Sequence, residues 1–325
     1  MHMKRMKNTL SLLLALTLLA FMGAGCATQS SKPAGETSLK PVRLGIVPLP
    51  HYAHIWIAKK NGYIEEELAR AGYKLDWQPF NLGPVVSEAF AAGHLDVGVM
   101  GDFPAFIGRS AGTDYQIVSI ASTAPEALAV VVRMDAGISS IADLKGKKVG
   151  TTRGAYGTKL LSLLLDKNGM TMDDIRFVNL SMDDLAVALV RGDVDAGVMW
   201  DPLLTRMEDA GEISIIANGT GVYQGTAVVV AATKFITENQ KAVEALKTAF
   251  ARGSQFIRDN PDEAIRLLNE DLKIPPEQLK KILRKFNYDG AITDSLVAEL
   301  KDTEKFLRET GLIKNPVDME VFLRK

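Results

Sequence analysis

The chain has 325 residues, a formal net charge of −1 and 47% hydrophobic residues. This length suits two α/β lobes behind an N-terminal leader, and the absence of a basic patch interleaved with aromatic residues argues against nucleic acid as a partner. The single cysteine excludes an intramolecular disulfide.

The N-terminus has the pattern of a secretory signal. Three basic residues precede an apolar stretch over 10–21, which is too short to span a bilayer. Small residues stand before Cys26 as in a bacterial lipobox, although Gly23 replaces the usual leucine. We therefore expect a lipoprotein signal peptide over 1–25 and lipidation at Cys26; soluble secretion is the alternative. The polar stretch 26–40 predicts a disordered tether between membrane and folded body.

Strands and helices alternate through the first half of the body. The pattern predicts strands over 42–47, 73–80, 95–100 and 116–119, and helices over 51–60, 65–71 and 84–92.

The same alternation continues further along the chain. It predicts strands over 128–133, 175–180, 194–199, 213–217 and 227–231, with helices over 156–167 and 182–191 and an almost wholly helical segment over 239–323. Alternating strands and helices favour mainly parallel sheets.

One ten-residue segment occurs twice. Residues 93–102 and 192–201 share six identities at an offset of 99 residues, and each segment follows a predicted helix and precedes a proline. The repeat indicates two α/β lobes with equivalent strand ends, which is where open α/β sheets place ligand sites. Chance similarity between two ordinary turns is the alternative, because glycine and aspartate are common in turns.

The order of elements also predicts the lobe boundaries. We expect lobe 1 to comprise 41–127 and 233–325 and lobe 2 to comprise 128–232, with the chain crossing near 126–131 and returning near 223–230. Two crossing segments form a hinge that can close around a ligand.

Several motifs together resemble one family of proteins. They are Ala58-Lys59-Lys60-Asn61-Gly62-Tyr63, Gly101-Asp102-Phe103-Pro104, Ile141-Ala142-Asp143-Leu144-Lys145-Gly146-Lys147-Lys148-Val149 and Trp200-Asp201-Pro202. Their order over nearly the whole mature chain resembles the substrate-binding proteins of ABC importers for nitrate, sulfonates and taurine, a group that also includes thiamine-precursor binders. The resemblance implies a two-lobed α/β fold of the type II periplasmic-binding-protein (Venus-flytrap) class, with mainly parallel sheets and a small anion or zwitterion held in the cleft between the lobes.

Three loops that lead from a strand into a helix are candidate anion sites, since helix N-termini offer free N–H groups and a favourable dipole. The first loop contains Pro50, His51 and Tyr52, and the second contains Gly101, Asp102 and Phe103. The third contains Thr152, Arg153, Gly154, Ala155 and Tyr156. Arg153 could pair with a sulfonate through two hydrogen bonds, or it could simply solvate the loop.

Other candidate residues could have a structural role instead of contacting the ligand. Asp102 and Asp201 end the repeated strands, and N-capping is the role that we favour for both beside an anion site. Trp200 and Tyr223 could line the ligand or pack in the core or hinge. Glu126, at the first crossing, could bind an ammonium group such as that of taurine or form a hinge salt bridge.

His51 and His54 lie three residues apart, but no other ligand-type cluster accompanies them, so we expect no metal and no cofactor.

We expect a monomeric, lipid-anchored solute-binding protein outside the cytoplasm that delivers a small organic sulfonate, taurine or an alkanesulfonate, to an ABC permease. Nitrate, an aromatic acid or an aminopyrimidine is the alternative ligand. An enzyme on the same fold is the alternative class, although no nucleophile–base pair is evident. A receptor that signals when loaded is a further alternative.

Overall fold

The computed structural model describes residues 39–81 and 83–324, and its folded unit begins at Leu39. The predicted signal peptide, Cys26 and nearly all of the predicted tether lie outside the described residues. Lys40, which the sequence analysis assigns to the tether, is instead the first residue of β1 (Lys40–Ile46) and pairs with Tyr73. Within the described part of the chain, no helix is both long and apolar enough to cross a bilayer.

The first of two five-stranded sheets combines strands from both ends of the body. Its order is β2 (Tyr73–Pro79), β1, β3 (Val97–Gly101), β10 (Ala227–Ala232) and β4 (Tyr115–Ser122). β10 is antiparallel to β3 and β4, so the other four strands run in one direction. The sheet is therefore mixed, with a parallel majority.

The second sheet has the same construction. Its order is β7 (Arg176–Asn179), β6 (Lys148–Thr151), β8 (Ala196–Trp200), β5 (Leu128–Arg133) and β9 (Ile213–Asn218). Here β5 is the antiparallel strand. Side chains of β5 alternate between two apolar clusters, with Val130 and Val132 in one and Ala129 and Val131 in the other, so both faces of this sheet are buried.

The repeated segment forms equivalent parts of the two sheets, β3 and β8. Gly98 and Gly197 are needed because a Cβ atom there would lie 2.3 Å from Phe90 and 2.7 Å from Leu185. In both copies, an aspartate before the strand accepts a hydrogen bond from the first parallel strand. Asp96 accepts from the Arg43 backbone N–H at 2.9 Å. Asp195 accepts from the Lys148 backbone N–H at 2.7 Å. The repeat is thus a packing unit as well as a sequence pattern.

The chain passes between the sheets after β4 and again after β9. The first connection contains the 3-10 helix η2 (Pro125–Ala127), and the return connection is 219–226. The boundary expected at residue 232 is too late, because β10 pairs with β3 and β4 of the first sheet. The return connection is held against the outgoing one by the hydrogen bond from Gly219 N–H to the Pro125 carbonyl, 2.8 Å.

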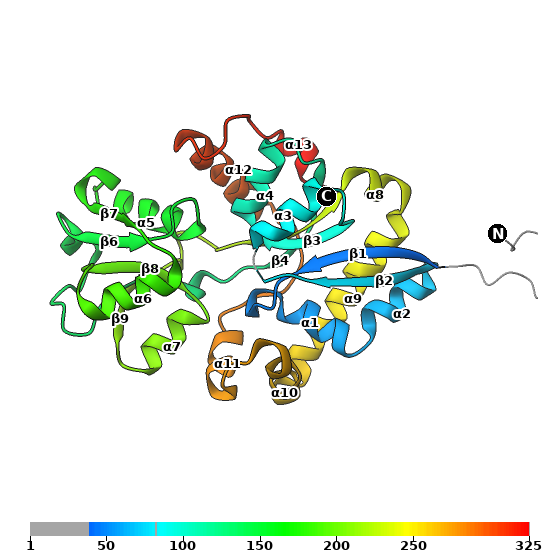
Figure 1. The fold of residues 1–325 in the computed structure, drawn as a ribbon, viewed down its shortest axis with the longest axis horizontal. Helices are drawn as coiled ribbons and strands as arrows, with labels where there is room; N and C mark the ends of the chain where they lie inside the picture. Colours follow the sequence, from blue (N-terminus) through cyan, green and yellow to red (C-terminus); the bar gives the residue numbers. More distant parts are fainter. Residues whose placement is uncertain (1–38, 82, 325) are drawn as a thin grey trace, which may run out of the picture. The chain divides into compact units, whose positions relative to one another are not determined.

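Helices cover both sheets (Figure 1). Around the second sheet lie η3 (Ile141–Leu144), α5 (Tyr156–Lys167), η4 (Met172–Asp174), α6 (Met182–Arg191) and α7 (Leu203–Asp209). Around the first sheet lie η1 (Pro50–Tyr52), α1 (Ala53–Lys60), α2 (Tyr63–Arg70), α3 (Gly83–Ala91), α4 (Asp102–Ser110), α8 (Thr233–Glu238), α9 (Gln240–Asp259), α10 (Pro261–Leu272), α11 (Pro276–Leu283), α12 (Asp294–Glu309) and α13 (Met319–Phe322). The C-terminal helices therefore complete the first-sheet body, and their buried side chains belong to its core.

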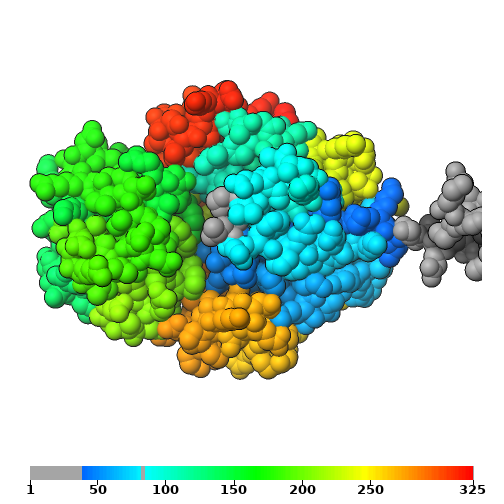
Figure 2. Space-filling model, viewed as in Figure 1, coloured from blue at the N-terminus to red at the C-terminus, as the bar shows by residue number. Residues whose placement is uncertain are grey.

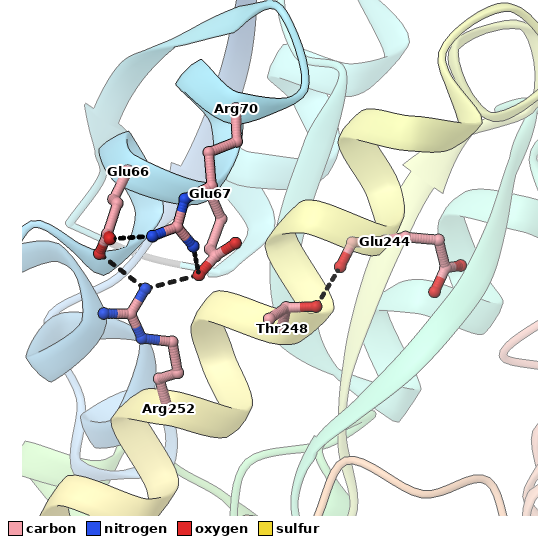
Figure 3. A network of polar contacts seen from close by, with 6 residues as sticks. All are labelled: Glu66, Glu67, Arg70, Glu244, Thr248 and Arg252. Carbon is pink, nitrogen blue, oxygen red and sulfur yellow. Dashed lines mark hydrogen bonds and ion pairs between the residues drawn. The ribbon is translucent and has the colours of Figure 1, made fainter.

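Ion pairs tie α9 to α2 at the surface (Figure 3). The Arg252 guanidinium lies 2.7 Å from Glu66 Oε2 and 2.5 Å from Glu67 Oε1, and Arg70 pairs with the same two carboxylates. Arg252 also lies over the ring of Tyr63, 4.1 Å from its centroid. The contacts of Arg252 join residues that are far apart in the sequence, and the partial exposure of these side chains limits what each ion pair adds to stability.

Candidate ligand-binding site

The carboxyl ends of β3 and β8 lead into two buried carboxylates, Asp102 and Asp201. Asp201 Oδ1 accepts a hydrogen bond from the Thr205 N–H in the first turn of α7, at 2.9 Å. Its other oxygen is paired with Lys285 Nζ at 3.0 Å. The N-cap residues are Pro202 in α7 and Gly101 in α4, so the N-cap prediction is wrong for both aspartates, although Asp201 does bind the first turn of its helix.

Asp102 is bound differently. It is the first residue of α4, and its carboxylate accepts the Phe103 N–H at 2.8 Å and the Tyr223 hydroxyl at 3.0 Å. The Thr303 hydroxyl lies 3.3 Å from Oδ2. Burial raises the pKa of Asp102, against the opposing effects of the Lys159 ammonium and these hydrogen bonds. Asp102 and Tyr223 are therefore part of one buried, hydrogen-bonded group.

His51 connects the two sheet bodies. It is buried in η1, and its Nε2 lies 3.2 Å from the hydroxyl oxygen of Tyr156 at the start of α5. Phe286 packs edge-on against the imidazole, with ring centroids 4.8 Å apart. Burial lowers the pKa of His51 to about 4, so the ring is neutral at pH 7. Among the described residues, its buried Nδ1 has no hydrogen-bond partner.

α5 begins without a side-chain cap. Its N-cap residue is Ala155, whose side chain cannot accept a hydrogen bond. The Thr158 N–H donates to the Ala155 carbonyl at 2.9 Å, which leaves the N–H groups of Tyr156 and Gly157 as the free donors of the first turn. The preceding Gly154 has a φ of 76°, a left-handed conformation that suits glycine. The Thr152 hydroxyl donates to the Leu180 carbonyl at 2.8 Å, so it is engaged within the protein.

Arg153 has a different environment from the buried groups. It is exposed, its backbone N–H donates to Asn179 Oδ1 at 2.8 Å, and its guanidinium lies over the ring of Phe177, 4.8 Å from the centroid. The structure therefore places this side chain against β7.

Trp200 lies beside Tyr156, with ring centroids 4.9 Å apart, so His51, Tyr156 and Trp200 form a continuous set of rings. Trp200 and Pro202 also line a groove of about 370 Å³ between α7 and the α10–α11 connection. The far side of this groove includes Lys273 and Ile274. Lys281 of α11 pairs with Asp209 of α7 at 2.6 Å. In Figure 2, orange residues of the α11 region adjoin yellow-green residues of the second-sheet body.

The remaining candidates take four kinds of position. The Pro50 carbonyl accepts the Tyr288 hydroxyl at 2.6 Å. Phe103 and Tyr52 are buried in the core of the first-sheet body. Gly101 is the N-cap residue of α4. Glu126 is exposed on η2 in the outgoing connection.

Sequence reasoning missed Lys159 and Thr303. Both are buried, and Lys159 Nζ donates to the Thr303 hydroxyl at 2.7 Å across 144 residues. A lysine beside the buried leucines of 156–167 was a signal that could have drawn attention to α5. The partner on α12 had no local signal. Among residues 39–81 and 83–324, no cluster of three or more metal-ligating side chains is present.

Comparisons with known proteins identify related chains. A family model described as NMT1/THI5 like matches residues 50–264. A Bacillus subtilis (strain 168) protein named for binding aliphatic sulfonates is 27% identical over 95% of this chain and 92% of its own length. A protein of the same name from Escherichia coli (strain K12) is 26% identical, covering 97% of this chain and 95% of its own.

Solved structures give the same fold. The crystal structure of the periplasmic aliphatic sulphonate binding protein SsuA from Escherichia coli superposes with a TM-score of 0.82 at 24% identity, covering 88% of this chain and 92% of that one. The predicted two-lobed α/β binding-protein fold is thereby confirmed. An enzyme is also among the relatives: a 4-amino-5-hydroxymethyl-2-methylpyrimidine phosphate synthase from Candida albicans (strain WO-1) is 25% identical over 66% of each chain. The two relatives that match nearly the whole chain are named as sulfonate-binding proteins, and they support a solute-binding role.

Proposed function

Because the chain belongs to the NMT1/THI5-like family, we propose that it is the solute-binding component of an ABC importer and captures a small organic sulfonate between its two sheets. The names of its full-length relatives support this ligand class. We assign residues before η2 and after the return connection to lobe 1, and β5 to β9 to lobe 2. Closure of the two lobes around the ligand is the motion expected for such a protein.

The observation that carries the proposal is the uncapped N-terminus of α5 next to the neutral ring of His51. A sulfonate is an anion with three acceptor oxygens. Free N–H groups at a helix N-terminus donate to such oxygens, and the helix dipole favours their charge. When the Tyr156 hydroxyl donates to His51 Nε2, the unpaired Nδ1 carries the proton and becomes a further neutral donor.

The nearby carboxylates do not oppose an anion in this arrangement, because each has a cation near it. Asp201 is paired with Lys285, and Lys159 is the largest opposing charge that acts on Asp102. Arg153 adds a positive charge from its exposed position on the loop before α5. We expect it to attract the anion over a distance rather than to hold it by paired hydrogen bonds.

Glu126 bears on the choice between taurine and a plain alkanesulfonate. It is exposed in the outgoing connection, where a carboxylate can favour a ligand with an ammonium end. We propose that it contributes this preference. Taurine and ethanesulfonate, which have the same carbon chain length, are therefore compared directly in the experiment below.

The experiment is a thermal-shift screen of the purified protein against taurine, alkanesulfonates, isethionate, nitrate, sulfate, aromatic acids and aminopyrimidines. A ligand at about 100 times its dissociation constant stabilises the folded state by about 2.7 kcal/mol, which raises the melting temperature clearly. We expect sulfonates to raise the melting temperature. Because Arg153 acts from a distance, we expect Arg153→Ala to lower the affinity for a sulfonate less than about tenfold. A response to aminopyrimidines or nitrate without one to sulfonates would overturn the ligand class. No response from any compound would leave the enzyme and receptor alternatives to be tested.

We also propose that a lipid on Cys26 anchors the protein to the outer face of a membrane. The lipobox-like residues before Cys26 support this. Substituting Cys26→Ser removes the thiol that would be acylated, so we expect the variant to carry no lipid and to retain its signal peptide. The size and membrane fraction of both proteins can be compared in cell extracts. Normal maturation of the variant would contradict the lipid anchor.

A further inference from the structure

Lys159 connects α5 of the second-sheet body to α12 of the first-sheet body. Its side chain is 2% exposed, and its ammonium donates to the Thr303 hydroxyl at 2.7 Å and to the Glu299 carbonyl at 3.4 Å. The same ammonium lies over the ring of Tyr223 in the return connection, 4.7 Å from its centroid. One buried cation on α5 thus contacts residues from two other parts of the chain, α12 and the return connection.

Asp102 is the anion that balances this cation. Thr303 lies between them, because its hydroxyl accepts from Lys159 and is 3.3 Å from Asp102 Oδ2. Tyr223 donates to the same carboxylate at 3.0 Å. Both charged groups have lost most of their contact with water, so each depends on the other and on these hydroxyl groups for stabilisation.

The same helix α12 also holds the return connection. The carboxylate of Glu299 accepts the backbone N–H of Gln224 at 2.9 Å and the hydroxyl of Thr226 at 3.1 Å. The contact between α5 and α12 is therefore made beside the segment that would act as a hinge. Any opening that separated α5 from α12 would leave the Lys159 ammonium and the Asp102 carboxylate without their buried partners.

The proposed anion site is one turn from this contact. Tyr156 and Lys159 are three residues apart on α5, so the ring that meets His51 and the ammonium that meets Thr303 move with the same helical turn. A helix held rigidly at Lys159 keeps its free N–H groups in place against His51. Loss of the contact would allow the N-terminus of α5 to move away from the first-sheet body.

We propose that Lys159 is a positioning residue for ligand binding: its bridge to Thr303 and Asp102 holds the N-terminus of α5 against the first-sheet body and slows release of the enclosed ligand. The statement about ligand release rests on the proposed function. The statement about α5 and α12 concerns the protein without ligand and can be tested separately.

The test compares Lys159→Met with Lys167→Met, which removes an exposed lysine from the other end of the same helix. Stopped-flow measurement with butane-1-sulfonate should show a dissociation rate raised about tenfold in Lys159→Met and an association rate changed less than about threefold. Lys167→Met should have the same dissociation and association rates as the wild-type protein. Thr303→Val removes the hydroxyl between the two charges and should raise the dissociation rate by a smaller factor. If Lys159→Met does not fold, Thr303→Val replaces it as the variant that tests the bridge.

Hydrogen–deuterium exchange without ligand gives the second measurement. We expect faster exchange over 156–161 and 299–303 in Lys159→Met or Thr303→Val than in Lys167→Met. If the unchanged protein does not bind butane-1-sulfonate, the proposed ligand class fails, while this exchange difference still supports the link between α5 and α12. Unchanged exchange in both helices would overturn the positioning role. Faster exchange with an unchanged dissociation rate would overturn its effect on ligand release.

Discussion

Two histidines one helical turn apart are both buried without charge. His54 is 2% exposed and lies between Tyr288 and Phe250, with ring centroids 5.0 Å and 6.1 Å away. Burial lowers the pKa of His54 to about 3 and that of His51 to about 4. His54 therefore acts as an aromatic core residue, whereas His51 faces Tyr156 and belongs to the candidate site.

These lowered pKa values predict acid sensitivity. Below the ordinary histidine pKa of 6.5, the unfolded chain binds protons that the folded chain excludes. The free energy of unfolding therefore falls as the pH falls from 6.5 toward 4, by up to about 1.4 kcal/mol per pH unit for each histidine, and this contribution is fully present above pH 6.5. Urea denaturation at pH 7.5, 6.0 and 5.0 would measure it.

The variant His54→Phe separates the two histidines. It should show a shallower loss of stability between pH 6.5 and 5.0, since His51 alone of the buried pair remains to titrate. His94→Gln, at an exposed position, is the control and should keep the original slope. An unchanged slope in His54→Phe would show that burial of His54 does not cause the acid sensitivity.

Some helices of this fold begin with a side-chain cap, whereas others, including α5, do not. Ser181 caps α6 by accepting the Asp184 N–H at 3.2 Å, and Thr293 caps α12 by accepting the Leu296 N–H at 3.3 Å. α5 has Ala155 at the same position and no cap. An uncapped N-terminus at the carboxyl end of a strand, beside a buried donor, is the arrangement expected of an anion site.

Adding a cap to α5 should therefore separate stability from binding. Ala155 has the extended backbone of a usual N-cap residue, so Ala155→Asp should stabilise the protein by about 1 kcal/mol. The added carboxylate should compete with a sulfonate for the same N–H groups and lower its affinity by more than about tenfold. Thermal denaturation and calorimetric titration would measure the two effects. Ala155→Ser supplies a cap without charge. Unchanged sulfonate affinity in Ala155→Asp would place the anion elsewhere.

At the scale of the whole molecule, the two connections between the sheets are packed against each other. A Cβ atom at Gly219 would lie 2.4 Å from the Tyr223 carbonyl oxygen and 2.8 Å from the Pro125 carbonyl oxygen. Both neighbours are backbone atoms, so neither can move aside as a side chain could. Gly219 is therefore a point of close contact between the outgoing and return connections.

The variant Gly219→Ala should force these connections apart and destabilise the protein by about 1–3 kcal/mol. Gly221→Ala in the same connection is the matched control. Gly221 has open space around its Cβ position but a φ of 69°, so its cost should be about 1 kcal/mol from backbone strain alone. Chemical denaturation of the two variants would measure the difference. A smaller loss of stability in Gly219→Ala than in Gly221→Ala would contradict the close approach.

The sequence by itself determined the alternation of strands and helices and the equivalence of β3 and β8. These depend on local periodicity and on glycine and aspartate positions that recur at a fixed offset. The sequence also pointed to the loop before α5, because this loop leads from a predicted strand into a predicted helix and contains Gly154 and Arg153. The order of elements along the chain placed the end of lobe 2 too late, at residue 232. No local sequence pattern shows that β10 pairs with β3 and β4 of the first sheet.

Tertiary structure alone decided how the polar side chains are used. It paired Lys159 with Thr303, set His51 beside Tyr156 and laid Arg153 over Phe177. The first two contacts join residues more than 100 positions apart, so they have no periodic signal in the chain. The cost of burying a charge or a polar atom depends on which partners the fold brings to it, and that information exists only once the two sheets and the C-terminal helices have packed together.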